Sequence, residues 1–264
     1  MATHKKGIQK IEEIIRLCKA DLHIHSHYSD GYPTIGQILA YVENHTDLDC
    51  IAITDHDTIL GALEAKEIMR RKKYRFELII GEEVSSRDGH IVGLYLHKPV
   101  PPGLSARKTI KLIHEQRGIA IAAHPFERTR FNNPHMVIMD GVGGNILVKN
   151  RHYFDGIEIV NATPTLDDEN FKASALNKTV LGLTETGSSD AHIPEAIGRA
   201  YTLYEGQTAK DLKKALRNGQ TQAMLARWTV MALLKYLFFF IPIGIRLVIN
   251  TIVQGKRPIR DGFE

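Results

Sequence analysis

Residues 19–31 read KADLHIHSHYSDG, a short apolar run that ends in two histidines and opens into a polar loop. His23 and His25 are two positions apart, so in a strand their side chains share one face and can bind the same metal ion. The loop that follows places Asp30 beside them. The stretch therefore predicts a buried strand at 20–25 whose carboxyl end carries metal ligands.

The same pattern recurs along the chain, where apolar runs alternate with helical stretches. We expect further strands at 50–54, 77–80, 90–96, 119–123, 156–160 and 180–184, and helices at 34–44, 59–72, 105–117 and 209–217. Short apolar runs between helices of about 10–15 residues are typical of parallel βα units. In a barrel of such units the carboxyl ends of the strands meet at one mouth. Polar residues at these ends are therefore expected to form one site.

Nearly every expected strand ends in, or begins with, a residue that can bind a metal. These residues are Asp55, His56 and Asp57 after the second strand, Glu82 and Glu83 after the third, His90, His124, and Asp190 with His192. Burying unpaired carboxylates costs several kcal/mol each, whereas metal ions compensate their charge. The set therefore predicts a metal centre.

Taken in order, these motifs resemble the PHP (polymerase and histidinol phosphatase) family over residues 20–204. The motifs are His23-x-His25 with Ser29-Asp30-Gly31, Thr54-Asp55-His56-Asp57, Gly81-Glu82-Glu83, His90-Ile91-Val92-Gly93, Ala123-His124-Pro125 and Ser189-Asp190-Ala191-His192. The resemblance implies an α/β fold, a distorted (β/α)7 TIM-like barrel, with two or three divalent metal ions. It also implies nine ligands: His23, His25, Asp30, His56, Glu83, His90, His124, Asp190 and His192. The family pattern G-x-E selects Glu83 over Glu82.

Six imidazoles and three carboxylates suit Mn, Zn or Fe better than Mg or Ca, which prefer oxygen ligands. Three carboxylates against two or three divalent ions leave the site positive and open to phosphate. We expect a metal-dependent phosphoesterase in which a metal-activated water hydrolyses a phosphate ester of a nucleotide, a short oligonucleotide or a small metabolite. The candidate catalytic residues are Asp30, Glu83 and His192, with Glu83 as the carboxylate that bridges metals.

Two other functions are left open: a metal-dependent amidohydrolase of the larger TIM-barrel type, and a membrane-tethered metal-binding module without turnover. Asp55 is expected either to orient an imidazole or to cap the following helix. Arg128, Arg130 and Arg199 are candidates for a second phosphate contact, although a solvated arginine is the commoner role. His27 is a candidate substrate contact that matches no ligand position.

Composition excludes several classes of protein. The chain has 264 residues, 43% hydrophobic and 24% charged, which is average for a soluble globular protein. Cys18 and Cys50 are too few for a disulfide framework or a cysteine zinc site, and they favour a reducing cytoplasm. The last 38 residues carry six basic and two acidic residues, which leaves 28 of each sign elsewhere. Long duplex nucleic acid is therefore not an expected partner.

The chain divides into four expected segments. These are an N-terminal amphipathic helix (1–19), the metal-dependent phosphoesterase domain (20–206), a closing helix (207–226) and a hydrophobic basic tail (227–264). Residues 229–253 hold only two charged residues, so the tail is a candidate contact with an anionic membrane surface. Packing on the barrel or in a dimer interface is the alternative. Residues 127–154 are expected to form a loop-rich flap near the site.

Overall fold

The computed structural model describes residues 16–130, 137–139 and 141–239. Its main sheet has the strand order β11-β10-β1-β2-β3-β4-β5-β8-β9. The strands are β1 (Leu17–Asp21), β2 (Cys50–Ile53), β3 (Glu77–Ser86), β4 (Gly89–Leu94), β5 (Ile119–Ala122), β8 (Gly156–Asn161), β9 (Thr184–Ser188), β10 (Ala200–Glu205) and β11 (Thr221–Leu225). The strands predicted in the first two thirds of the chain are present, with shifted ends.

The sheet is mixed rather than a uniform succession of parallel units. β1, β2 and β3 are parallel to one another, as are β5, β8 and β9. β4 is antiparallel to both β3 and β5, and β10 is antiparallel to β1 and β11. The physical reason at β4 is the connection: β3 runs to Ser86 and β4 begins at Gly89, whose φ is 122°. Two residues can close a hairpin but cannot hold a crossover helix.

The two edges of the sheet come together through side-chain hydrogen bonds. The Thr202 hydroxyl on β10 donates to the Gly187 carbonyl on β9 at 2.9 Å, and the Thr221 hydroxyl on β11 donates to the Glu185 carbonyl at 2.6 Å. A Cβ on Gly187 would lie 2.7 Å from the Tyr201 carbonyl oxygen, so only glycine permits this approach. The chain is thus an α/β fold with a nearly closed, barrel-like sheet.

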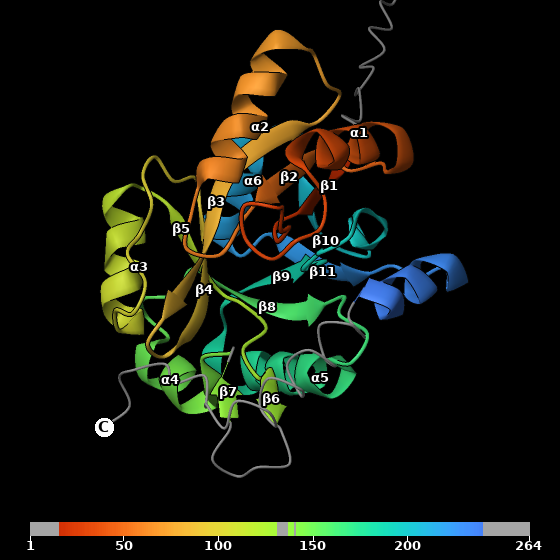
Figure 1. Ribbon diagram of the computed structural model, residues 1–264. Helices are drawn as coiled ribbons and strands as arrows, with labels where there is room; N and C mark the ends of the chain where they lie inside the picture. Colours follow the sequence, from red (N-terminus) through yellow and green to blue (C-terminus); the bar gives the residue numbers. More distant parts are fainter. Residues whose placement is uncertain (1–15, 131–136, 140, 240–264) are drawn as a thin grey trace, which may run out of the picture.

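Helices surround this sheet on its outer side (Figure 1). They are α1 (Ile35–His45), α2 (Leu60–Arg71), α3 (Ala106–Glu115), α4 (Gly143–Asn150), α5 (Asp167–Leu176) and α6 (Ala209–Asn218). α1 and α6 begin with capping boxes, in which Thr34 and Thr208 are the N-cap residues. α3 buries one apolar stripe that includes Ile110 and Ile113, whereas α5 buries only Ala173.

In the second half of the chain one expected strand is wrong, and the expected loop-rich segment holds regular elements. The strand expected at 180–184 is instead a π-helix, Asn177–Leu181, followed by Gly182 at φ 63° and then by β9. The Asn177 side chain causes this: it accepts from the Leu183 amide at 2.8 Å and donates to the Leu183 carbonyl at 3.0 Å. The expected flap at 127–154 contains β6 (Arg128–Arg130), β7 (Val137–Met139) and α4.

The two ends of the chain also differ from expectation. β1 begins at Leu17, inside the expected N-terminal helix; the rest of that helix lies outside the described residues. The expected closing helix at 207–226 is α6 followed by strand β11. The tail is described as far as residue 239, and residues 230–239 form a helix that buries Ala232 and Tyr236 (Figure 1). In the part of the chain that the structure describes, no helix has the length and hydropathy needed to cross a membrane.

Candidate metal centre

Glu83 lies at the middle of the site, with imidazole nitrogens around both of its carboxylate oxygens. Oε1 lies 2.9 Å from His124 Nε2 and 3.0 Å from His90 Nδ1. Oε2 lies 3.2 Å from His23 Nε2, 3.3 Å from His25 Nε2 and 3.2 Å from His56 Nδ1. One carboxylate thus faces five histidines from four different strands and loops. Glu83 is shared by two groups of potential metal ligands, one with His23 and His124 and one with His56 and His90.

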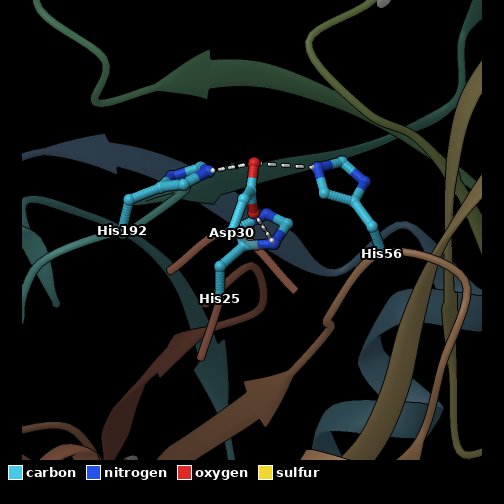
Figure 2. A group of neighbouring side chains, drawn as sticks. All are labelled: His25, Asp30, His56 and His192. Atoms are coloured by element: carbon cyan, nitrogen blue, oxygen red, sulfur yellow. Dashed lines mark ion pairs between the residues drawn. The ribbon is translucent and has the colours of Figure 1, made fainter. Parts of the chain in front are cut away.

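Asp30 is the centre of a second group, at the rim of the site (Figure 2). Its Oδ2 lies 3.2 Å from His192 Nε2 and 3.6 Å from His56 Nε2, while its Oδ1 lies 3.5 Å from His25 Nδ1. The Asp30 side chain is 54% exposed, whereas those of the three histidines range from 0% to 26%. Asp30 therefore lies on the solvent side of the histidines.

Asp190 joins the two groups from the end of β9. Its Oδ1 lies 3.1 Å from His25 Nε2 and 3.6 Å from His23 Nε2. Its Oδ2 accepts from Asn161 Nδ2 at 3.1 Å. The Nδ1 of His192 donates to the Asp190 carbonyl at 2.9 Å, which leaves Nε2 of His192 facing Asp30.

The structure brings all nine predicted ligands together. They fall into overlapping groups whose ligand atoms lie within 4.8 Å of one another, and one of these groups also contains Glu127. The groups border a cavity of about 250 Å³ lined by Asp30, His56, Glu83, His90, His124, Glu127, Thr163, Asp190, His192 and Tyr236.

The carboxylates and histidines of the centre shift one another's pKa values strongly. Burial opposes ionisation of Glu83 and Asp190, but the surrounding histidines hold the pKa of both carboxyls well below the usual range. Conversely, burial lowers the pKa of His23 and His124, but neighbouring carboxylates raise the pKa of both imidazoles well above its usual value. The pKa of His192 is raised to about 9, because Asp30 and Asp190 outweigh its burial. The carboxylates therefore require positive charge beside them.

The donor set fits divalent metal ions. Several buried atoms have no hydrogen-bond partner among the described residues: Nε2 of His23 and His25, Nδ1 of His56, both ring nitrogens of His90 and Oε2 of Glu83. Unpaired buried polar atoms are costly, and so many converging in one place indicate a ligand. Mixed nitrogen and oxygen donors are the ligands that Mn, Zn and Fe accept.

Two further carboxylates hold the outer sides of ligand histidines, and sequence reasoning missed both. Glu158 Oε1 lies 3.3 Å from His23 Nδ1, and its Oε2 accepts from the His124 amide at 2.8 Å. Glu127 Oε2 lies 3.0 Å from His124 Nδ1. A carboxylate on the outer nitrogen fixes the ring and strengthens it as a ligand. The signal for Glu158 was present, since it is a lone acid within the apolar strand GIEIV.

Glu82 and Asp55 have structural roles beside the centre. Glu82 points away from Glu83 because side chains alternate along a strand. It accepts from the Val100 amide at 2.8 Å, and burial raises its pKa to about 7. Asp55 neither caps α2, whose N-cap is Ile59, nor contacts an imidazole directly. It accepts from the Ser26 amide at 2.7 Å and from the Ser29 hydroxyl at 2.8 Å, and so holds the loop that carries Asp30.

Arg199 and His27, two of the residues expected to contact substrate, do not line the cavity. Arg199 donates to the Glu195 and Arg227 carbonyls at 3.0 and 3.1 Å, so it holds the chain rather than lining the cavity. His27 is exposed and its ring contacts Tyr28. The side chains of Arg128 and Arg130 lie outside the described part of the chain.

Local backbone geometry at the centre is unusual. His124 and Asp190 have φ angles of 23° and 51°, which residues other than glycine rarely adopt. A Cβ on Gly31 would lie 2.5 Å from the His25 carbonyl carbon, so glycine is required where the Asp30 loop crosses the first strand. Strain of this kind is concentrated at functional sites.

Comparisons with known proteins relate the chain to a family and to a fold. A family model described as PHP-associated matches residues 168–221. An uncharacterized protein of Methanocaldococcus jannaschii is 36% identical over 155 residues, which is 54% of this chain and 82% of that protein. A phosphoribosyl 1,2-cyclic phosphate 1,2-diphosphodiesterase of Eggerthella lenta is 34% identical over 87 residues, and the chain spans about one third of it (32%).

One similar solved structure is a two-domain protein from Bacteroides vulgatus that contains a predicted PHP-like metal-dependent phosphoesterase. Its TM-score is 0.62 at 19% identity, over 80% of this chain and 66% of that one. At this identity the match supports the fold.

Proposed function

Because the chain belongs to the PHP family of metal-dependent phosphoesterases, we propose that it hydrolyses a phosphate ester of a nucleotide, a short oligonucleotide or a small metabolite. The observation that carries the proposal is Glu83, whose two oxygens face five imidazoles in a buried site.

We propose three divalent ions, drawn from Mn, Zn or Fe. Three carboxylates were expected at the centre, but five are present: Asp30, Glu83, Glu127, Glu158 and Asp190. Counted as ionised, they carry five negative charges, so two divalent ions would leave the centre negative and three would leave it positive. A positive centre is the one that attracts a phosphate. Of the two or three ions expected from the sequence, this charge count favours three.

When bound, the metals supply Lewis-acid polarisation of the phosphate and a water nucleophile of lowered pKa. The residues proposed as catalytic are Asp30, Glu83 and His192. Glu83 would bind metal through its carboxylate oxygens, with the five imidazoles around it. Asp30 and His192 lie at the rim, 3.2 Å apart, where they would orient the attacking water through hydrogen bonds.

The size and charge of the cavity favour a small substrate. Its volume is about 250 Å³, and no lysine or arginine is among its described lining residues. The positive charge that attracts phosphate must then come from the metals. A cavity of this size leaves little room for a long nucleic-acid duplex. The similarity to the Eggerthella lenta enzyme adds a cyclic phosphodiester of a sugar to the candidate substrates.

The test is phosphate release by the purified, Mn-loaded protein. The panel comprises a nucleoside 3′,5′-bisphosphate, a short 5′-phosphorylated oligonucleotide, histidinol phosphate, an aryl phosphate and a ribose cyclic phosphodiester, the last followed by chromatography. We expect turnover that Asp190→Asn abolishes and that Asp168→Asn, an exposed acid on α5, leaves intact. A folded, metal-loaded protein that hydrolyses none of the panel would contradict the proposal.

We further propose a cytoplasmic protein whose tail contacts an anionic membrane surface. The helix at 230–239 turns Ala232 and Tyr236 inward and leaves several apolar side chains exposed, namely Val230, Met231, Leu234, Leu237 and Phe238. An exposed apolar helix face with basic residues nearby, here Arg227 and Lys235, is typical of helices that lie at the water–lipid boundary of a bilayer.

A further inference from the structure

Hydrogen-bond donors are scarce in the cavity of the metal centre. Eight of the ten described lining residues are histidines or carboxylates, and the remaining two are Thr163 and Tyr236. Ionised carboxylates only accept hydrogen bonds, and a histidine bound to metal directs its free nitrogen away. Among the described lining residues, Thr163 and Tyr236 carry the neutral hydroxyl groups, and the two side chains are hydrogen-bonded to each other.

Tyr236 reaches the cavity from the segment that was expected to be a separate tail. The segment after β11 is attached to the body at successive points. The Ala226 amide donates to the Arg199 carbonyl at 2.7 Å, and the Trp228 indole donates to the Ala162 carbonyl at 2.9 Å. Lys235 forms an ion pair with Glu195. These contacts place one face of the 230–239 helix over the site.

The ring of Tyr236 is held in a defined position. It packs against Trp228 edge to face, with ring centroids 5.3 Å apart and planes at 72°. Tyr236 is 9% exposed. Burial and the negative charge of Asp190 raise the pKa of the Tyr236 phenol, which a hydrogen bond with the Thr163 side chain only partly offsets. The phenol therefore stays protonated and able to donate at neutral pH.

We propose that Tyr236 binds the substrate by donating a hydrogen bond to a phosphate oxygen that does not face the metals, while the Thr163 hydroxyl donates to the Tyr236 oxygen and orients it. This inference rests on the proposed function, since it takes the ligand to be a phosphate ester. It assigns the segment at 226–239 to the wall of the active site. It also explains how a site without lysine or arginine in its described lining holds the outer side of an anion.

The first test is Tyr236→Phe, which keeps the ring against Trp228 and removes only the hydroxyl. We expect KM for the best substrate to rise about 10-fold with kcat within about twofold, because a bond to a charged group is lost from ground and transition states alike. Tyr204→Phe is the matched control, since Tyr204 is buried on β10 beside Cys50 and lies outside the cavity. An unchanged KM in Tyr236→Phe would overturn the inference.

A second test does not depend on turnover. Trp228 is the single tryptophan of the chain, and it contacts Tyr236, so its fluorescence reports on this wall. Titration of the Zn-loaded protein with inorganic phosphate is expected to change the emission, with about 10-fold weaker affinity in Tyr236→Phe than in the wild type or Tyr204→Phe. Equal affinity in all three, or no response in the wild type, would overturn the inference. Failure of the substrate panel alone would instead overturn the proposed function.

Discussion

Glu82 and Glu83 are adjacent, buried and chemically identical, yet the pleat of β3 sends them to opposite sides. Glu83 meets five imidazoles, while Glu82 accepts a backbone hydrogen bond from Val100. Of these two neighbouring residues, Glu83 alone therefore faces the potential metal ligands.

This pair gives a matched substitution. Glu83→Gln is expected to weaken metal binding by more than about 100-fold, beyond the loss typical of residues outside the ligand shell, and to abolish turnover. Glu82→Gln keeps its acceptor oxygen and is expected to retain both. Metal content after gel filtration and phosphate release measure the difference. Equal metal content in the two variants would contradict the assignment of Glu83.

Glu158 tests the outer carboxylates. In Glu158→Gln the ring of His23 loses a charged partner, so we expect metal affinity to fall about 10–100-fold while the fold persists. Glu185→Gln in the neighbouring strand β9 is the control, because Glu185 is not in the centre. Competition against a fluorescent chelator measures the affinity. An unchanged affinity in Glu158→Gln would show that Glu158 only packs.

At the scale of the element, α3 is joined to β8 by an ion pair beneath the barrel. His114 Nε2, in the last turn of α3, lies 2.8 Å from Asp155 Oδ2, just before β8. The same carboxylate oxygen accepts from the Ala120 amide on β5 at 2.7 Å. The hydrogen bond with Asp155 raises the pKa of His114 and outweighs its partial burial.

The stability contributed by this pair depends on pH with a definite sign. Because the pKa of His114 is higher in the folded chain than in the unfolded one, the contribution is fully present below about pH 6.5 and is lost as pH rises through the folded value. Urea unfolding should show that His114→Gln destabilises the protein more at pH 5.5 than at pH 9. His97→Gln, an exposed histidine, should show no such difference. The opposite trend would contradict the pairing.

The elements also show what sequence could predict. The nine ligands meet because they lie at strand ends or in the strands and loops beside them, and that arrangement follows from apolar runs followed by His, Asp or Glu. The antiparallel β4 was missed because a two-residue turn, Arg87 and Asp88, decides the direction of a strand that looks like the others. The π-helix was missed because the apolar run around Val180 resembles a strand, and only the hydrogen bonds of Asn177 reveal otherwise. The position of Tyr236 beside the cavity could not be predicted from the sequence. It depends on contacts with residues distant in the sequence, such as the hydrogen bond from Trp228 to Ala162.

At the scale of the whole molecule, the described start of the tail has two faces. One face packs over the metal centre through Tyr236, and the other exposes Val230 and Phe238 at 77% and 79%. The tail can therefore complete the site and still offer an apolar surface.

The exposed face predicts binding to vesicles of phosphatidylcholine and phosphatidylserine. Phe238→Ser should reduce the fraction that sediments with them, because an aromatic anchor is lost from the interface. Phe171→Ser is the matched control, as Phe171 on α5 is equally exposed, at 75%. If the wild type does not sediment with vesicles, the membrane contact is wrong, and the account of the metal centre is unaffected.

We propose that the nine residues form one multinuclear metal centre around Glu83. The most direct measurement is an anomalous difference map from crystals of the protein grown with Zn. We expect up to three peaks at about 2.0–2.2 Å from ligand atoms of the nine residues, with Glu83 shared between two of the ions. A map with no peak beside Glu83, in a chain folded as described, would contradict the account.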